Sequence, residues 1–256
     1  MTIDLNCDMG ESFGAYEMGN DAELMRHISS ASIACGFHAG DPTVMRRTIE
    51  LGMNHGVSLG AHPSYPDLQG FGRREMKMSA DEVYDIVVYQ ISAVKGICES
   101  LGTKLNHVKP HGALYNKAAR CRSTADAIVK AVASIDTDLI VFGLAGGDLT
   151  KSARAHGLRC ADEGFADRRY ESDGSLTPRS VADALLSDPE EAARQVLRMA
   201  LGELIASRQG PQIKIAADTI CIHGDGKNAL KIAVAVRKIL DQSGITVAPI
   251  SVNRVS

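Results

Sequence analysis

The chain has 256 residues, long enough to bury the core of one large domain, and 45% of them are hydrophobic. Its net charge of -3 offers no excess of Lys and Arg for nucleic acid, and no apolar run approaches the roughly 20 residues of a membrane helix. The N-terminal residues lack a secretory-signal pattern, and the six scattered cysteines form no C-x-x-C pair. We therefore expect a cytoplasmic protein with reduced thiols.

Short apolar segments, each followed by a polar turn and a helix, recur seven or eight times along the chain. The expected strands cover residues 2–7, 31–35, 57–61, 105–108, 139–142, 159–161, a part of 213–222, and a last strand-like run at 245–250. This alternation, over about 250 residues, predicts a single domain spanning 1–256 with an α/β fold, a (β/α) barrel.

Several helix starts carry capping signals. Asn20 and Ser79 are each followed three residues later by Glu, the pattern of a capping box. Asp41 and Asp188 each precede a proline, as an N-cap followed by the first helical residue. The sequence therefore supports two interpretations of Asp41 about equally, as a helix cap and as a site residue.

The first expected strand alternates between apolar and polar side chains. Its apolar residues suit packing against helices, while Asp4 and Asn6 would point into the barrel. Asp8 and Glu11 follow at or just beyond the strand end. In a barrel, that end is where chemistry is placed.

Histidines, in one case with a lysine, recur where other expected strands end. The strand-end candidates are His38, His62, Lys109, His111, and His223 with Asp225. One such residue alone would more often be packed or solvated, but the recurrence predicts a shared site at one barrel mouth. Within it, Lys109 follows an apolar strand that Pro110 should terminate. The other histidines (His27, His55, His107 and His156) are interpreted as structural.

Three chemistries suit these residue types. Asp and His could hold a divalent metal that activates water, although no H-x-x-x-H spacing is present. Alternatively, carboxylates and histidines act as general acids and bases, while Lys109, Arg73 and Arg74 bind phosphate or an oxyanion. A cysteine nucleophile is the third option, but Cys7, Cys35 and Cys221 fit strand packing better.

Six blocks, spread from end to end of the chain, resemble the LamB/YcsF family. They are DLNCDMGESFG from Asp4, IACGFHAGDP from Ile33, GAHPSYPDLQGFGRR from Gly60, VKPHGALYN from Val108, FADRRY from Phe165 with SDGSLTPR from Ser172, and CIHGD from Cys221. One departure is Ser32, where the family pattern leads us to expect asparagine.

The resemblance implies a distorted seven-stranded barrel, like those of glycoside hydrolases and polysaccharide deacetylases. It also implies ATP-dependent opening of 5-oxoproline to glutamate, with Mg-bound ATP as co-substrate and with partner subunits B and C. An unstrained lactam is a poor electrophile, so phosphorylation of its oxygen would supply a leaving group. Under this hypothesis Asp8 or a histidine acts as base, and Lys109, Arg73 and Arg74 lie near phosphate.

Two rival functions remain open at this point. One is a stand-alone metal-dependent deacetylase or amidohydrolase, and the other is a non-catalytic binding subunit of the complex. The segment from Gly143 to Gly147 matches neither common nucleotide-binding glycine motif, so ATP is assigned neither to this chain nor to a partner. The identity of a metal and a homo-oligomeric state are likewise open.

Overall fold

Seven parallel strands close into a barrel in the computed structural model, which describes residues 1–226 and 228–250. Each strand pairs in parallel with the next, and β1 pairs with β9 to close the ring. The barrel strands are β1 (Thr2–Met9), β2 (Ser30–Ala34), β3 (Ser58–His62), β4 (His107–Val108), β5 (Ile140–Leu144), β6 (Cys160–Phe165) and β9 (Thr219–Ile222). The predicted barrel is therefore confirmed.

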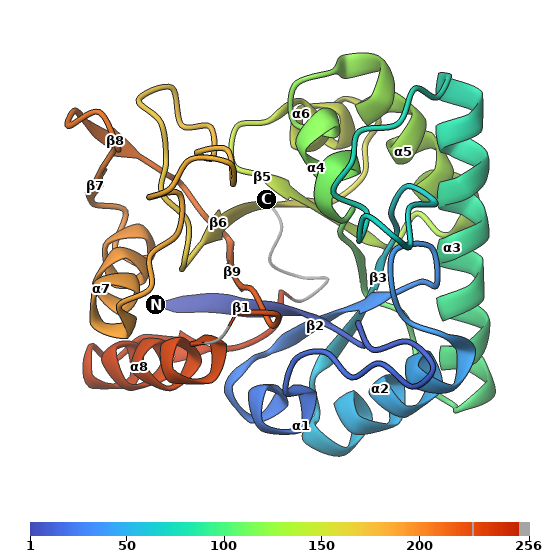
Figure 1. Cartoon of the computed structure of the whole chain (residues 1–256), viewed down its shortest axis with the longest axis horizontal. Coiled ribbons are helices and arrows are strands. Elements are labelled where there is room, and N and C mark those ends of the chain that lie inside the picture. The colour runs from blue at the N-terminus through green and yellow to red at the C-terminus, as the bar shows by residue number, and fades with distance from the viewer. Residues whose placement is uncertain (227, 251–256) are drawn as a thin grey trace.

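Helices surround this barrel (Figure 1). They are α1 (Asp21–Leu24), the 3-10 helix η1 (Met25–His27), α2 (Pro42–His55), α3 (Ala80–Ser100), α4 (Gly112–Ala118), α5 (Arg122–Ile135), α6 (Asp148–Ala155), α7 (Pro189–Ala200) and α8 (Ala229–Gln242). None of the helices within 1–226 and 228–250 combines the length and the apolar character needed to span a membrane.

The capping signals are confirmed at three of four helices. Asp41 accepts hydrogen bonds from two backbone amides of α2, Ser79 forms a capping box with Glu82, and Asp188 caps α7. At Asn20 the helix does begin at the next residue, but the predicted capping box is absent, because the Asn20 side chain makes no capping hydrogen bond and α1 ends after one turn. The neighbouring Asp21 instead accepts a 2.8 Å hydrogen bond from Gly10 N, which ties this segment to the end of β1.

In the C-terminal half of the chain, the strand boundaries differ from those that the sequence predicts. The sixth strand continues to Phe165, four residues beyond its predicted end. Of residues 213–222, only Thr219–Ile222 enter the barrel, because β8 (Gln212–Lys214) pairs antiparallel with β7 (Leu204–Ala206) in a separate hairpin. From the last run, β10 (Thr246–Val247) pairs with the first residues of β1, outside the closed ring.

Apolar and polar side chains alternate along β1 and have different surroundings, as the sequence predicts. Ile3 and Leu5 pack into a hydrophobic cluster with residues of α7 and α8. Asp4 and Asn6 are also buried, but they hydrogen-bond to polar side chains of other strands, including Thr219 on β9. The barrel interior therefore holds a polar network that is enclosed by an apolar outer shell.

Candidate functional site

A cavity of about 460 Å3 opens at the carboxyl ends of the strands. Its volume lies in the range of small-molecule sites, roughly 300–1,000 Å3. Eight of the predicted site residues line it: Asp8, Glu11, His62, Arg73, Lys109, His111, His223 and Asp225.

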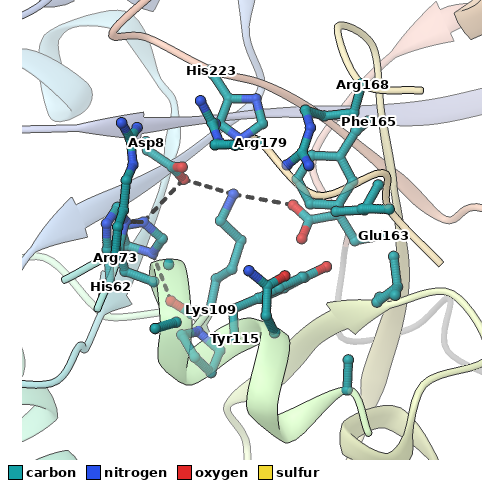
Figure 2. Close-up of a pocket in the computed structure, with 18 of the residues that line it drawn as sticks. Asp8, His62, Arg73, Lys109, Tyr115, Glu163, Phe165, Arg168, Arg179 and His223 are labelled. Carbon is teal, nitrogen blue, oxygen red and sulfur yellow. Dashed lines mark hydrogen bonds and ion pairs between the residues drawn. The ribbon is translucent and has the colours of Figure 1, made fainter. Parts of the chain in front are cut away.

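Lys109 lies at the floor of this cavity, and only 2% of its surface is exposed. Its Nζ is 2.6 Å from Asp8 Oδ1 and 3.1 Å from Glu163 Oε1, so the amine lies between two carboxylates (Figure 2). The backbone explains this position. Lys109 N still donates to Ala61 O of β3, whereas Pro110 has no amide hydrogen with which to continue the pairing.

The charges of this group stabilise one another. Burial alone would favour the neutral amine, but the negative charges around it, with Asp8 the largest of them and Glu163 adding to it, together outweigh burial and raise the pKa of Lys109 well above its usual value. Burial would likewise raise the pKa of Asp8, yet His62 and Lys109 hold that pKa well below its usual range. At neutral pH the floor of the cavity therefore carries a buried ammonium ion and a buried carboxylate.

Asn6 and Glu163 orient Lys109 from the opposite side of the barrel. Asn6 Oδ1 accepts from Lys109 Nζ at 2.8 Å, and its Nδ2 donates to Glu163 Oε1 at 2.9 Å and to Thr219 Oγ1 at 2.8 Å. The second oxygen of Glu163 and the hydroxyl of Tyr115 are buried and have no hydrogen-bond partner among the described residues. Both residues line the cavity, where these atoms could meet polar atoms of a ligand.

Three histidines and Glu11 form a second cluster beside Lys109. His62 Nε2 lies 3.0 Å from His111 Nδ1 and 3.3 Å from Asp8 Oδ1. His38 stacks on His111 with their ring centroids 3.8 Å apart, and its Nε2 is 3.3 Å from Glu11 Oε1. Burial lowers the pKa of both His38 and His111 well below the usual value, which favours neutral rings.

The loop after β3 folds over the histidine cluster. Ala113 N donates to Gly72 O, and the Gly112 backbone has a φ of 54°. A Cβ at Gly112 would lie 2.5 Å from Gly72 O, so a larger residue would push the loop away from the site. Phe71 from the same loop accepts a hydrogen bond from His111 through its carbonyl.

His223 forms a dyad with Asp167 on the far side of the cavity. Its Nδ1 donates to Asp167 Oδ1 over 2.7 Å, which leaves Nε2 available. Burial alone would raise the pKa of Asp167, but the charge and hydrogen bond of His223, together with the nearby arginine charges, outweigh burial and lower it. A histidine oriented by a carboxylate in this way is the usual arrangement of a general base.

Arginines supply positive charge around the mouth. Arg73 forms an ion pair with Asp225 and lies over the ring of Phe71. Arg168 and Arg179 line the cavity on the His223 side (Figure 2). Burial, and then the charge of Arg179, lowers the pKa of Arg168 to about 10, and its Nε has no hydrogen-bond partner among the described residues. Two adjacent cations of this kind suit a carboxylate or a phosphate.

The remaining predicted site residues do not line this cavity. Asp41 caps α2, and Arg74 pairs with Asp67 at the surface. Asp4 lies deeper in the barrel, where it accepts from Ser29, Ser30 and Thr219. The other two, Asn6 and His38, support the residues that do line it.

The residues interpreted as structural also have defined places. His107 is buried, stacks on Phe142 and lies 3.3 Å from Ser32 Oγ, so Ser32, which stands where asparagine is expected, makes a polar contact with a barrel histidine. Burial raises the pKa of Cys7, Cys35 and Cys221, which keeps them as thiols and agrees with packing.

Sequence reasoning misses several residues that line or support the cavity: Tyr115, Glu163, Asp167, Arg168 and Arg179. The sequence pattern places Glu163 in a loop, because the predicted sixth strand ends at Ala161. The apolar residues Phe165 and Ala166 beyond it are the available signal for a longer strand. Asp167 and Arg168 lie inside the FADRRY block, in a charged segment up to Arg179 that the sequence predicts as a loop able to reach over the site, although it gives neither residue a specific role.

The LamB/YcsF family model matches residues 3–255, nearly the whole chain. The chain belongs to the LamB/YcsF family. A relative from Tolumonas auensis, named as the A subunit of 5-oxoprolinase, is 55% identical over 245 residues, covering 96% of this chain and 98% of the relative. A relative of the same name from Bacillus subtilis is 53% identical over 252 residues, 98% of each chain.

A solved structure agrees with this family membership. The crystal structure of the lactam utilization protein from Thermus thermophilus is 47% identical, with a TM-score of 0.93. The alignment covers 98% of this LamB/YcsF chain and all of that chain. The barrel described above is therefore the fold of a family whose relatives are named for lactam chemistry.

Proposed function

We propose that this protein is the A subunit of an ATP-dependent 5-oxoprolinase. It cleaves 5-oxo-L-proline to L-glutamate, with hydrolysis of ATP to ADP and phosphate, and acts in the cytoplasm with subunits B and C. The observation that carries the proposal is the full-length identity of above 50% to relatives that are named as this subunit of 5-oxoprolinase. The charged cavity supports a catalytic role for this subunit.

The cavity contains groups suited to each part of 5-oxoproline. The substrate carboxylate would bind Arg168 and Arg179, whose side chains offer bidentate donors. The lactam N–H would donate to the free oxygen of Glu163. Lys109 would stabilise negative charge on the lactam oxygen, or on a phosphoryl group transferred to it from ATP.

Ring opening also needs a base that activates water. His223 is the best-placed candidate, because Asp167 orients its ring and leaves Nε2 without a proton when the ring is neutral. Attack of water on the phosphorylated lactam carbon, with cleavage of the C–N bond and protonation of the departing nitrogen, yields glutamyl phosphate. A second water then hydrolyses this acyl phosphate to glutamate and phosphate. Arg73, held by Asp225 at the rim, would neutralise phosphate charge.

The direct test is glutamate formation by the purified chain, alone and with candidate subunits B and C. We expect glutamate and phosphate in equal amounts, and only when ATP and all three subunits are present. Glutamate formed by this chain without ATP would instead favour the metal-dependent amidohydrolase.

A variant of His223 separates a catalytic subunit from a binding subunit. In His223→Asn the amide can still donate to Asp167, but the Nε2 position is lost, so turnover of the complex should fall about 100-fold or more. His55→Gln, an exposed change on α2, is the matched control and should keep full activity. Normal turnover by His223→Asn would remove His223 from the mechanism.

A further inference from the structure

Backbone carbonyls determine where the protons lie on two histidines of the cluster. His62 Nδ1 is 2.6 Å from Lys109 O, and His111 Nε2 is 2.9 Å from Phe71 O. A carbonyl oxygen only accepts hydrogen bonds, so both of these ring nitrogens carry their hydrogen. In the neutral form of each ring, the other nitrogen, His62 Nε2 or His111 Nδ1, is the atom that carries a lone pair and can bind a cation.

These two nitrogens lie close together. His62 Nε2 and His111 Nδ1 are 3.0 Å apart, and the two rings meet at 84°. A contact between two lone pairs is repulsive, so it needs a cation bound to both nitrogens, either a shared proton or a metal ion. Glu11 Oε1 lies 3.6 Å from His111 Nδ1, and Glu11, His38, His62 and His111 each offer one ligand atom within 4.8 Å of the others.

The spacing suits a metal ion. Zinc–nitrogen and zinc–carboxylate distances of about 2.0–2.2 Å place tetrahedral ligands roughly 3.3–3.6 Å from one another. The two measured separations, 3.0 and 3.6 Å, lie at or near that range. Metal-bound histidines also characteristically donate their other N–H to a backbone carbonyl, as His62 and His111 do.

His38 supports these residues and is not itself a ligand. Its ring is parallel to His111, within 4°, at a centroid distance of 3.8 Å. A metal ion bound to a histidine lies in the plane of the imidazole ring. Two parallel, stacked rings therefore do not bind the same ion. His38 Nε2 instead lies 3.3 Å from Glu11 Oε1, where an N–H orients the carboxylate.

We propose that His62, His111 and Glu11 form a three-ligand site for one transition-metal dication of the zinc type. All three line the cavity, so a further coordination position is open to water or substrate. Two imidazoles favour zinc-like ions over Mg2+ or Ca2+, which prefer oxygen ligands. Such an ion would act as a Lewis acid beside Lys109.

The experiment uses the purified full-length chain without a histidine tag. The metal is removed with a chelator, and Co2+ is titrated while the visible absorption and the metal content are measured. We expect one Co2+ per chain, a four- or five-coordinate spectrum, displacement by Zn2+, and a higher Tm with metal than without.

Two variants remove the ligand atoms but keep the carbonyl contacts. His62→Asn keeps a donor near the Nδ1 position, and His111→Gln keeps one near Nε2. Each should weaken Co2+ binding at least 100-fold and abolish the rise in Tm, while circular dichroism confirms folding. His55→Gln, which removes an exposed histidine, should bind Co2+ like the unmodified chain.

Two outcomes would overturn the proposal: no stoichiometric Co2+ binding by the unmodified chain, or unchanged binding by both folded variants. Loss of Co2+ binding in His55→Gln would place the bound ion at the protein surface and would likewise contradict the proposal. The measurement needs neither ATP nor 5-oxoproline nor a partner subunit. Its failure is therefore distinguishable from failure of the proposed 5-oxoprolinase activity.

Discussion

Lys109 shows how one residue can serve both stability and chemistry. From the sequence, replacing Lys109 or His111 by alanine should abolish activity and leave the fold intact. The structure changes that expectation for Lys109, because its amine offsets the charges of Asp8 and Glu163 inside the barrel. Removing one member of a buried ion pair leaves its partner without compensation.

We predict that Lys109→Met lowers the free energy of unfolding by about 3–5 kcal/mol. Adding Glu163→Gln should recover part of this loss, since it removes one of the two uncompensated carboxylates. Urea denaturation measures both effects, and Lys151→Met, an exposed change on α6, is the control. Stability equal to that of the unmodified chain would contradict the buried ion-pair network.

At the scale of elements, the packing of β3 against β4 depends on a missing side chain. Gly60 lies in β3 opposite His107 of β4, and a Cβ there would be 2.1 Å from His107 Nε2. His107 cannot easily move aside, because it stacks on Phe142 of β5 with ring centroids 4.2 Å apart. Gly96, in contrast, is exposed on α3 with no atom within 4 Å of its Cβ position.

We predict that replacement by alanine has opposite effects on stability at these two glycines. Gly60→Ala should destabilise the chain by about 1–3 kcal/mol through overpacking. Gly96→Ala should stabilise it by up to about 1 kcal/mol through helix propensity. Urea midpoints of the two variants provide the comparison, and a neutral Gly60→Ala would mean that the barrel interior accommodates the added methyl group.

At the scale of the whole molecule, Asp4 of β1 links its own strand to β2 and β9 deep in the barrel interior. It accepts hydrogen bonds from Ser30 of β2 and Thr219 of β9, and Glu163 of β6 lies near enough to add negative charge. Burial, only partly offset by these hydrogen bonds, raises the pKa of Asp4 from 3.8 to about 6. The folded chain therefore binds this proton more tightly than the unfolded chain does.

The raised pKa of Asp4 makes the stability of the fold depend on pH. A carboxyl group with a raised pKa stabilises the fold at low pH, and that stabilisation is lost as the pH rises through about 6. Relative to the unmodified chain, Asp4→Asn should gain about 2 kcal/mol of stability between pH 4.5 and pH 7.5. Urea unfolding at both pH values tests this, with Asp85→Asn as an exposed control on α3; a pH-independent difference would contradict it.

The sequence by itself determined the barrel and most of its mouth. Repeated strand–turn–helix units can bury their apolar faces only against one another, and the polar residues at strand ends then converge. The sequence pattern was sufficient to predict Asp8, His62, Lys109, His111 and His223, each of which lies within three residues of a strand end.

Tertiary structure decided which charges meet. Glu163 opposes Lys109 only because β6 continues past its predicted end and the barrel closes between β9 and β1. Asp167 orients His223 across 56 residues of sequence, and Arg74 turns away to Asp67. Such pairings depend on the three-dimensional register of strands and loops, which no short stretch of sequence encodes.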